Sequence, residues 1–363
     1  MNIFECNRLH ILNKETISPT YGDQMTTISD VANKAKVSTA TVSRVLNNSD
    51  KVRPLTRDRV NAVIQELNFV PNVNALGLQR KKTKTVGLIF PDASAYYFAE
   101  IIQGINRHLS QNEHQILISS AHDEEEEVKI INGFVRGGRI DGLIMMMPSA
   151  NGNNGLRIPS TYKIPEVFIS CDINAPRATT ILLDNYNAAR EMIQHLSKLG
   201  HKRIAFIHGG EHNYDARERY RGYVDGRKIY QADDDVNLEV MGNFTESSGF
   251  QATLELMKRN PKPTAIFAAN DAMAIGAIEA ARALKLKVPS DLAIVGFDDI
   301  SSAAYMDPAL TTVHVPLRRL GHLAAEAMLK NLKTDSLERT TEKIIIPLQH
   351  IIRRSCGSEQ TAI

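Results

Sequence analysis

The stretch VSTATVSRVLN, residues 37–47, carries side chains of the kind that contact nucleic acid. If it forms a helix, its larger apolar residues share one face, and the opposite face carries mainly short hydroxyl and methyl groups with one arginine. Short side chains let a helix enter the major groove, which is about 12 Å wide, and arginine donates two hydrogen bonds to guanine. The candidate base-reading residues are Thr39, Ala40 and Arg44, and the candidate DNA-backbone contacts are Ser38, Thr41, Ser43 and Asn47.

A second set of polar and aromatic residues comes directly after apolar segments further along the chain. If those segments are parallel strands, the residues that follow them gather at one edge of a sheet, where ligands of open α/β folds bind. Aromatic rings would enclose a ring of the ligand, and polar side chains would hydrogen-bond its hydroxyl or amide groups. The candidate ligand-binding residues are Tyr97, Phe98, Asp172, Asn213, Arg219, Phe267, Asn270 and Asp298.

The charge of the chain is concentrated at one end. Residues 25–82 hold ten Lys and Arg against four Asp and Glu, a net charge of +6, whereas the remaining residues hold 33 bases and 37 acids. A basic head on a mildly acidic body indicates a nucleic-acid partner at one end only. A solvated, lysine-rich linker is the alternative explanation of this imbalance.

Three short helices are predicted in the basic region. Thr27 is suited to cap a first helix with apolar residues spaced i, i+3, i+4 and i+7. Ser38 is suited to cap a second helix that runs to about Leu46, and Pro54 suits the first turn of a third. Two helices joined by a tight turn and braced by a third match the helix-turn-helix arrangement. The alternative, a helical bundle whose outer face is merely polar, leaves the caps and the charge unexplained.

The pattern changes after residue 84, where apolar strands alternate with amphipathic helices. This alternation is typical of buried parallel sheets with helices on both faces. Because the cycle restarts near residue 184, we expect two similar lobes. The expected strands are residues 85–90, 114–119, 142–147, 166–170, 203–209, 264–269 and 292–297, and the expected helices between them include residues 98–112, 186–199 and 271–285.

The segments TISDVANKAKVSTATVSRVLNNSDKV and TRDRVNAVIQELNFVPN closely resemble the headpiece of the lactose/galactose repressor (LacI/GalR) family of bacterial transcription regulators. The resemblance implies that Thr39, Ala40 and Arg44 read operator DNA. Arg53 stands where the family usually has a serine cap, which predicts a weaker cap on the third helix. In NALGL, the resemblance assigns Leu78 as a wedge in the minor groove; a plain flexible linker is the alternative.

Segments of the second region, among them LDNYNAA, GHKRIAFIHG, RERYRGY and VPSDLAIVGFDD, resemble the family's effector domain. The resemblance implies the fold of sugar-binding periplasmic proteins and assigns effector contacts to all the ligand-binding candidates above except Asn270. The chain looks most similar to the cytidine-repressor (CytR-like) branch, although VPLRRLG departs from that branch. A nucleoside such as cytidine is therefore placed slightly ahead of a sugar as the effector.

The expected architecture is an all-α helix-turn-helix DNA-binding head followed by an α/β two-lobed, periplasmic-binding-protein-like (type I) effector domain. Residues 1–24 show no core pattern and precede Met25, so they are expected to be disordered or to lie before the true start. The expected divisions are 25–71 for the DNA-binding domain, 72–82 for the hinge, 83–350 for effector binding and dimerisation, and 353–363 for a tail. Within the effector domain, lobe 1 is expected at about 84–183 and 316–345, and lobe 2 at about 184–314 and 346–352.

These features predict a homodimeric, cytoplasmic, effector-responsive repressor that binds double-stranded operator DNA and no membrane. No apolar run approaches the roughly 20 residues that span a bilayer, and the three cysteines lack metal-ligand spacing. The sequence contains neither a GxSxG elbow nor a GxxxxGK[ST] loop, so no catalytic residue, metal, cofactor or enzymatic activity is expected. The alternatives are a periplasmic-type sugar- or nucleoside-binding protein and, more remotely, a nucleoside or sugar enzyme.

Overall fold

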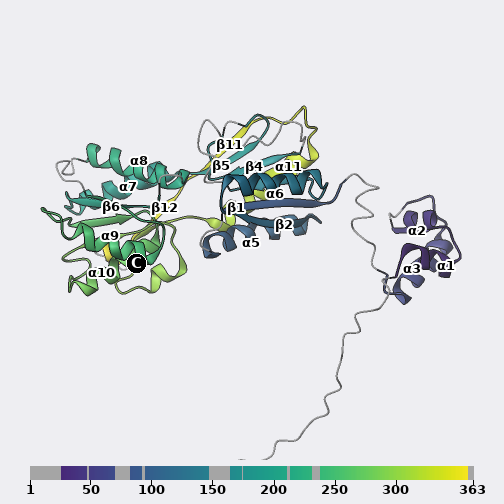
Figure 1. Cartoon of the computed structure of the whole chain (residues 1–363), viewed down its shortest axis with the longest axis horizontal. Coiled ribbons are helices and arrows are strands. Elements are labelled where there is room, and N and C mark those ends of the chain that lie inside the picture. Colours follow the sequence, from purple (N-terminus) through teal and green to yellow (C-terminus); the bar gives the residue numbers. More distant parts are fainter. Residues whose placement is uncertain are drawn as a thin grey trace, which may run out of the picture. The chain divides into compact units, whose positions relative to one another are not determined.

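The computed structural model describes residues 26–46, 49–69, 82–91, 95–146, 164–173, 175–210, 213–230 and 238–358. The chain divides into two compact units, residues 1–81 and 82–363 (Figure 1). The first unit holds the basic head, and the second holds the alternating strands and helices.

Three helices pack together in the described part of the first unit: α1 (Ile28–Ala35), α2 (Thr39–Leu46) and α3 (Pro54–Glu66). Thr27 closes a capping box with Asp30 at the start of α1, so its predicted capping role is confirmed. Arg53 makes no side-chain hydrogen bond that caps α3, which matches the weaker cap expected there. The buried core consists of the residues on the inner helix faces, namely Val31, Ala32, Ala35, Val42, Val45, Val52, Val60, Val63 and Phe69.

The first lobe of the second unit is built on a parallel sheet with the strand order β11-β5-β4-β3-β1-β2. Its strands are β1 (Thr85–Pro91), β2 (Gln115–Ala121), β3 (Gly142–Met145), β4 (Glu166–Ile169), β5 (Thr179–Leu183) and β11 (Glu342–Ile346). Successive residues of a strand point to opposite faces, and both faces of this sheet are covered. Helices α5 (Ala95–Gln111) and α11 (Leu317–Lys333) pack on one face, and α6 (Glu124–Arg136) packs on the other.

The second lobe repeats this plan with the strand order β7-β6-β8-β9. Its strands are β6 (Ile204–His208), β7 (Glu239–Met241), β8 (Ala265–Ala268) and β9 (Ala293–Val295), and its helices are α7 (Asn185–Lys198), α8 (Tyr214–Ile229), α9 (Glu246–Leu256) and α10 (Asp271–Ala283). Figure 1 shows α7 with α8 on one side of this sheet and α9 with α10 on the other. The predicted two-lobed α/β architecture is confirmed.

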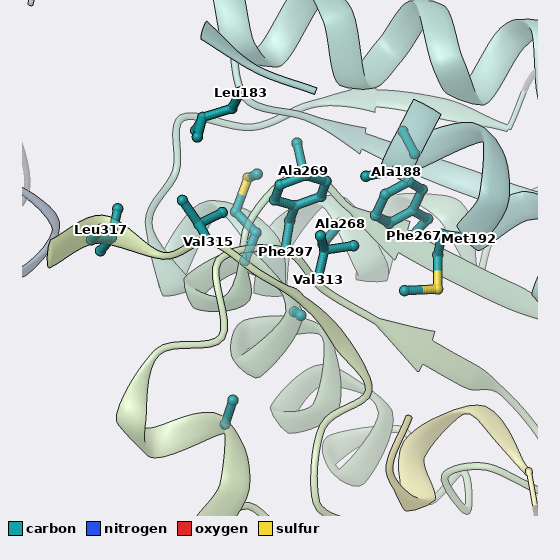
Figure 2. Close-up of a cluster of buried hydrophobic side chains, with 14 of the residues drawn as sticks. Leu183, Ala188, Met192, Phe267, Ala268, Ala269, Phe297, Val313, Val315 and Leu317 are labelled. Atoms are coloured by element: carbon teal, nitrogen blue, oxygen red, sulfur yellow. The ribbon is translucent and has the colours of Figure 1, made fainter. Parts of the chain in front are cut away.

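The two lobes are joined where the chain passes between them, after Leu183, after His314 and after Ile346. Next to these passages, β10 (Thr312–His314) pairs antiparallel with β12 (Gln349–Ile351). One continuous hydrophobic cluster runs through both lobes and includes Leu183 from the first lobe (Figure 2). The residues around the passages are therefore packed as part of the core.

The C-terminal segment does not leave the fold at the expected boundary of residue 352. A short 3-10 helix, Arg354–Cys356, packs against the second lobe. The Ser355 hydroxyl donates to the Ile294 carbonyl (2.6 Å) and accepts from the Thr311 amide (2.8 Å). The expectation of a tail from residue 353 is corrected here. Ser355 is polar, and the sequence alone does not distinguish a serine that forms buried hydrogen bonds from one in a solvated C-terminal tail.

Candidate DNA-binding face and effector site

The face of α2 that was predicted to meet DNA is turned to solvent. Val42 and Val45 are buried against the other helices of the head. On the outer side, Ser38, Thr39, Ala40 and Arg44 are exposed, and Thr41 and Ser43 are partly exposed. The predicted base-reading residues therefore share one accessible surface of a short helix.

Ser38 also fixes where this helix begins. Its hydroxyl oxygen accepts from the Thr41 amide (3.2 Å) and lies 2.9 Å from the Thr41 hydroxyl, as an N-cap does. The cap places Thr39 and Ala40 in the first turn of α2. Asn47 and the predicted wedge Leu78 lie outside the described residues.

Arg219 is the centre of a buried polar group in the second unit. Its guanidinium donates from Nε to Asn185 Oδ1 (2.8 Å) and from Nη1 to the Ala269 carbonyl (2.6 Å), and Nη1 lies 3.1 Å from Asp298 Oδ1. The guanidinium carbon sits 3.7 Å from the centroid of the Phe297 ring, a cation–π arrangement. Helix α8 thus supplies a cation whose position is fixed from four directions.

Two buried carboxyl groups face this cation. Asp215 lies one helical turn before Arg219 on α8 and accepts a hydrogen bond from Asn185 Nδ2 (2.8 Å). Burial raises the pKa of Asp215, and Arg219 opposes the rise. Burial also raises the pKa of Asp298 to about 6, again against Arg219. Asp298 has a φ of 108°, which few residues other than glycine adopt, and such constrained positions cluster at functional sites.

A stability measurement across pH tests this pairing. A carboxyl whose pKa is higher in the folded protein than in the unfolded chain binds its proton more tightly when folded, so it destabilises the fold as pH rises through the folded pKa. Between pH 5 and pH 7.5, we expect the wild-type chain to lose free energy of unfolding relative to Asp298→Asn. Urea denaturation of both proteins measures the difference, and a difference that does not change with pH would contradict the assignment.

A third carboxyl lies close by, at the start of α10. Asp271 is fully buried and accepts from the Thr312 hydroxyl (2.6 Å) and from the Ile300 amide (2.9 Å). Burial raises the pKa of Asp271 well above its usual range, and the neighbouring Asp298 adds to the rise. Asp271 therefore lies beside Asp298, which in turn faces Arg219.

Tyr97 and Ser170 bring hydroxyl groups from the first lobe. Burial raises the pKa of the Tyr97 phenol, and the nearby charges of Asp215 and Asp298 in the second lobe raise it further. The Tyr97 hydroxyl oxygen is buried and has no hydrogen-bond partner among the described residues, whereas the Ser170 hydroxyl hydrogen-bonds to Asp215 across the lobes. Buried hydroxyls normally find a partner, so a bound molecule would supply the partner that the Tyr97 hydroxyl lacks.

Asp172 stands at the edge of the same group. Its two carboxylate oxygens lie 2.8 and 3.0 Å from Lys343 Nζ, within the first lobe, and the side chain is exposed. Burial raises the pKa of Tyr214 at the start of α8, and the charges of Glu218 and Asp172 add to it. Asp172 therefore faces the helix that carries Arg219.

The aromatic candidates are placed differently from the prediction. Phe267 lies within β8 and is fully buried (Figure 2). Its ring is edge-on to that of Phe206. Phe98 is also buried and stacks on Phe90 with centroids 5.3 Å apart. The expectation that Phe267 stacks on a ligand is corrected, because a strand covered on both faces sends its side chains into the core. The ring that meets Arg219 is Phe297, which the prediction missed.

Asn213 and Asn270 both cap helices. Asn213 Oδ1 accepts from the Ala216 amide (3.0 Å) at the start of α8. Asn270 Oδ1 accepts from the Met273 amide (2.9 Å), and its Nδ2 donates to the Phe244 carbonyl (3.1 Å). Both asparagines thus hold the helix ends that position the buried acids.

The prediction also missed Asn185, Asp215 and Asp271 as members of this group. One of them had a readable signal: Asp215 precedes Arg219 by four residues, a spacing that places both on one face of a helix. Asn185 and Asp271 come together with Arg219 only through the folding of distant segments, so spacing along the chain gave no sign of them.

Two features are absent from the described residues. None of the helices there is long and apolar enough to cross a membrane. In the same residues, no three His, Cys, Asp or Glu side chains are grouped so that they would hold a metal ion.

Two family models match the chain. Residues 27–72 match the model of bacterial regulatory proteins of the lacI family. Residues 193–356 match the model of a periplasmic binding protein-like domain. The two matches fall on the helical head and on the second unit, respectively.

Curated relatives match over nearly their whole lengths. The probable HTH-type transcriptional repressor ExuR of Bacillus subtilis (strain 168) is 33% identical over 91% of this chain and 98% of its own. Catabolite control protein A of Priestia megaterium is 33% identical over 90% and 97%. The HTH-type transcriptional repressor PurR of Haemophilus influenzae (strain PittEE) is 32% identical over 92% and 99%.

Solved structures agree in fold. The lac repressor dimer bound to operator and the anti-inducer ONPF has a TM-score of 0.80, 26% identity, and coverage of 92% of this chain and 100% of that one. The transcriptional regulator CelR in complex with cellobiose has a TM-score of 0.68 and 29% identity, with coverage of 91% and 99%.

Proposed function

The chain belongs to the lacI family of bacterial regulatory proteins, and we propose that a neutral, hydroxyl-rich molecule bound around Arg219 sets its affinity for operator DNA. The chain is a DNA-binding transcriptional repressor regulated by a small effector, and not an enzyme. Such a regulator acts on DNA in the cytoplasm. The observation that carries the proposed effector class is the pair of buried acids, Asp215 and Asp298, beside Arg219, together with the unpaired Tyr97 hydroxyl near them.

The composition of the site favours neutral hydroxyl donors. Asp215 and Asp298 offer buried acceptors, whereas the Tyr97 and Ser170 hydroxyls can both donate and accept. A sugar hydroxyl matches both kinds of partner. An acidic effector would add negative charge beside the buried carboxyls of Asp215 and Asp298, where like charges repel strongly in a low dielectric. A neutral sugar therefore fits better than a sugar acid or a phosphate.

A nucleoside such as cytidine is the alternative effector, and the aromatic residues give it little support. A base needs a ring face to stack on, but Phe267 and Phe98 are packed in the core. The Phe297 ring is covered by the Arg219 guanidinium. Tyr97 remains as an aromatic candidate. The CelR relative was solved with cellobiose, which also favours a sugar.

A thermal-shift panel with neutral sugars, sugar acids, sugar phosphates and nucleosides tests the effector class. We expect a neutral sugar to stabilise the chain, by about 2.7 kcal/mol at a concentration of 100 times its Kd. We expect Asp215→Asn to reduce that stabilisation, and Asp225→Asn, further along α8, to leave it unchanged. Stabilisation by cytidine alone would instead support the nucleoside.

At the DNA, we propose that Thr39, Ala40 and Arg44 read base edges from the exposed face of α2. Ser38, Thr41, Ser43 and Asn47 would contact phosphates and fix the register of the helix. A homodimer would present two such helices to a two-fold symmetric operator. Leu78 is proposed as the minor-groove wedge on the basis of family resemblance.

A further inference from the structure

The chain enters the first lobe through residues held by a single carboxylate. Asp141 Oδ1 accepts from the Thr83 amide (2.8 Å) and the Thr83 hydroxyl (3.0 Å), and its Oδ2 accepts from the Lys84 amide (2.7 Å). Hydrogen bonds to a charged acceptor are among the stronger ones in proteins. The bonds link residues that are 57 and 58 positions apart in the sequence. Asp141 thus ties the start of this unit to the turn before β3.

The backbone at this entry is constrained on its other side as well. Lys84 has a φ of 52°, in the left-handed region, which persists in residues other than glycine only when the surroundings dictate it. The Lys84 carbonyl accepts from the Gln115 amide (2.8 Å), and Lys84 Nζ pairs with Glu113 (2.5 Å). Together these contacts hold Thr83 and Lys84 against the starts of both neighbouring strands, β2 and β3.

The entry and the effector site lie at opposite ends of one strand. β1 runs from Thr85, beside the Asp141 contacts, to Pro91, and α5 with Tyr97 follows it in the chain. β1 is paired along its length with β2 and also with β3. A movement of the first lobe around a ligand therefore reaches Thr83 and Lys84 through a rigid, paired strand.

We propose that Asp141 is a positioning residue that transmits the state of the effector domain to the DNA-binding head. The inference rests on the proposed function. In it, the Asp141 carboxylate keeps rigid the junction at which the chain enters the first lobe from the DNA-binding helices. Without the Asp141 carboxylate, Thr83 and Lys84 would detach from the sheet. The two heads of a dimer would then lose their defined spacing.

The test compares Asp141→Ala and Asp141→Asn with the wild-type full chain, using a duplex selected by the wild-type protein from a random library. We expect Asp141→Ala to lose about tenfold in affinity for the selected duplex, within the range typical of coupled sites. Affinity for a random duplex should not change, because the helices of the head remain intact. Asp141→Asn should lose less, since one acceptor oxygen is retained.

Limited trypsin digestion reads the junction directly. Mass spectrometry of the resistant core should show cleavage after Lys84 at least about ten times faster in Asp141→Ala than in the wild type, because local opening governs such cleavage. Glu113→Gln is the matched control: it removes only the exposed side-chain pair with Lys84, which contributes little, and it should behave as the wild type in both assays. The thermal unfolding midpoint of Glu113→Gln should also stay close to that of the wild type.

Unchanged affinity of Asp141→Ala for the selected duplex would overturn the proposal, and so would equal losses on selected and random duplexes. A wild-type chain that selects no duplex would refute the proposed function and the coupling with it. In that case the trypsin result still shows whether Asp141 holds the junction, so the two failures can be told apart.

Discussion

Arg219→Ala is expected to abolish the response to effector and to lower the free energy of unfolding by about 3–5 kcal/mol, the usual cost of removing one partner of a buried ion pair. The variant would leave Asp298 buried beside Asp215 without the cation that offsets both. It would also leave the Ala269 carbonyl and Asn185 Oδ1 without their donor. Urea denaturation measures the stability, and the thermal-shift panel measures the response to neutral sugars.

The matched control lies half a turn further along the same helix. Arg221 is exposed and pairs with the partly buried Glu218, and an ion pair in which one partner is solvated contributes little, about 0–1 kcal/mol. Arg221→Ala should therefore keep both the stability and the sugar response. If Arg219→Ala were as stable as Arg221→Ala and still responded to the same sugar, the site would not be centred on Arg219.

Arg44→Ala is expected to remove discrimination at one base pair of the operator, at a cost of about 1–3 kcal/mol for the preferred base. The physical reason is that a guanidinium can donate two hydrogen bonds to one guanine, and an alanine methyl group cannot replace them. Binding to duplexes substituted one position at a time measures the effect. The loss should be confined to the duplexes that carry the preferred base at that position.

Arg59→Ala controls for the loss of charge. Arg59 is exposed on α3, so its removal changes the net charge of the head by the same amount without touching α2. We expect a small, sequence-independent weakening that varies with salt. Equal weakening by Arg44→Ala on every sequence would make Arg44 a phosphate contact.

The described helices of the head could be predicted from sequence almost completely, because the patterns that define them involve residues only a few positions apart. The helical period separates Val42 and Val45 from Thr39 and Arg44 within a single turn or two, and the Thr27 cap involves residues three apart. The long central strands were predicted for the same reason, since each is a continuous apolar run. Strands β5, β7, β10, β11 and β12 were not predicted.

The effector site could be predicted only in part. Arg219 and Asp298 were identified, but their partners Asn185 and Asp271 reach them through contacts between distant segments. Phe267 was misplaced because a ring in an apolar strand looks the same in sequence whether it faces the core or a ligand. Strand pairing and the burial of each face decide whether such a ring meets the core or a ligand, and both depend on the whole fold.

The most direct test of effector control is to measure the affinity of the full chain for its selected duplex with and without the stabilising sugar. If effector binding around Arg219 controls operator affinity, then operator binding must change effector affinity by the same factor. We predict that a saturating neutral sugar changes affinity for the selected duplex by at least about fivefold and leaves affinity for a random duplex unaffected. A sugar that binds tightly around Arg219 and leaves operator affinity unchanged would contradict the proposed control of DNA binding by the effector.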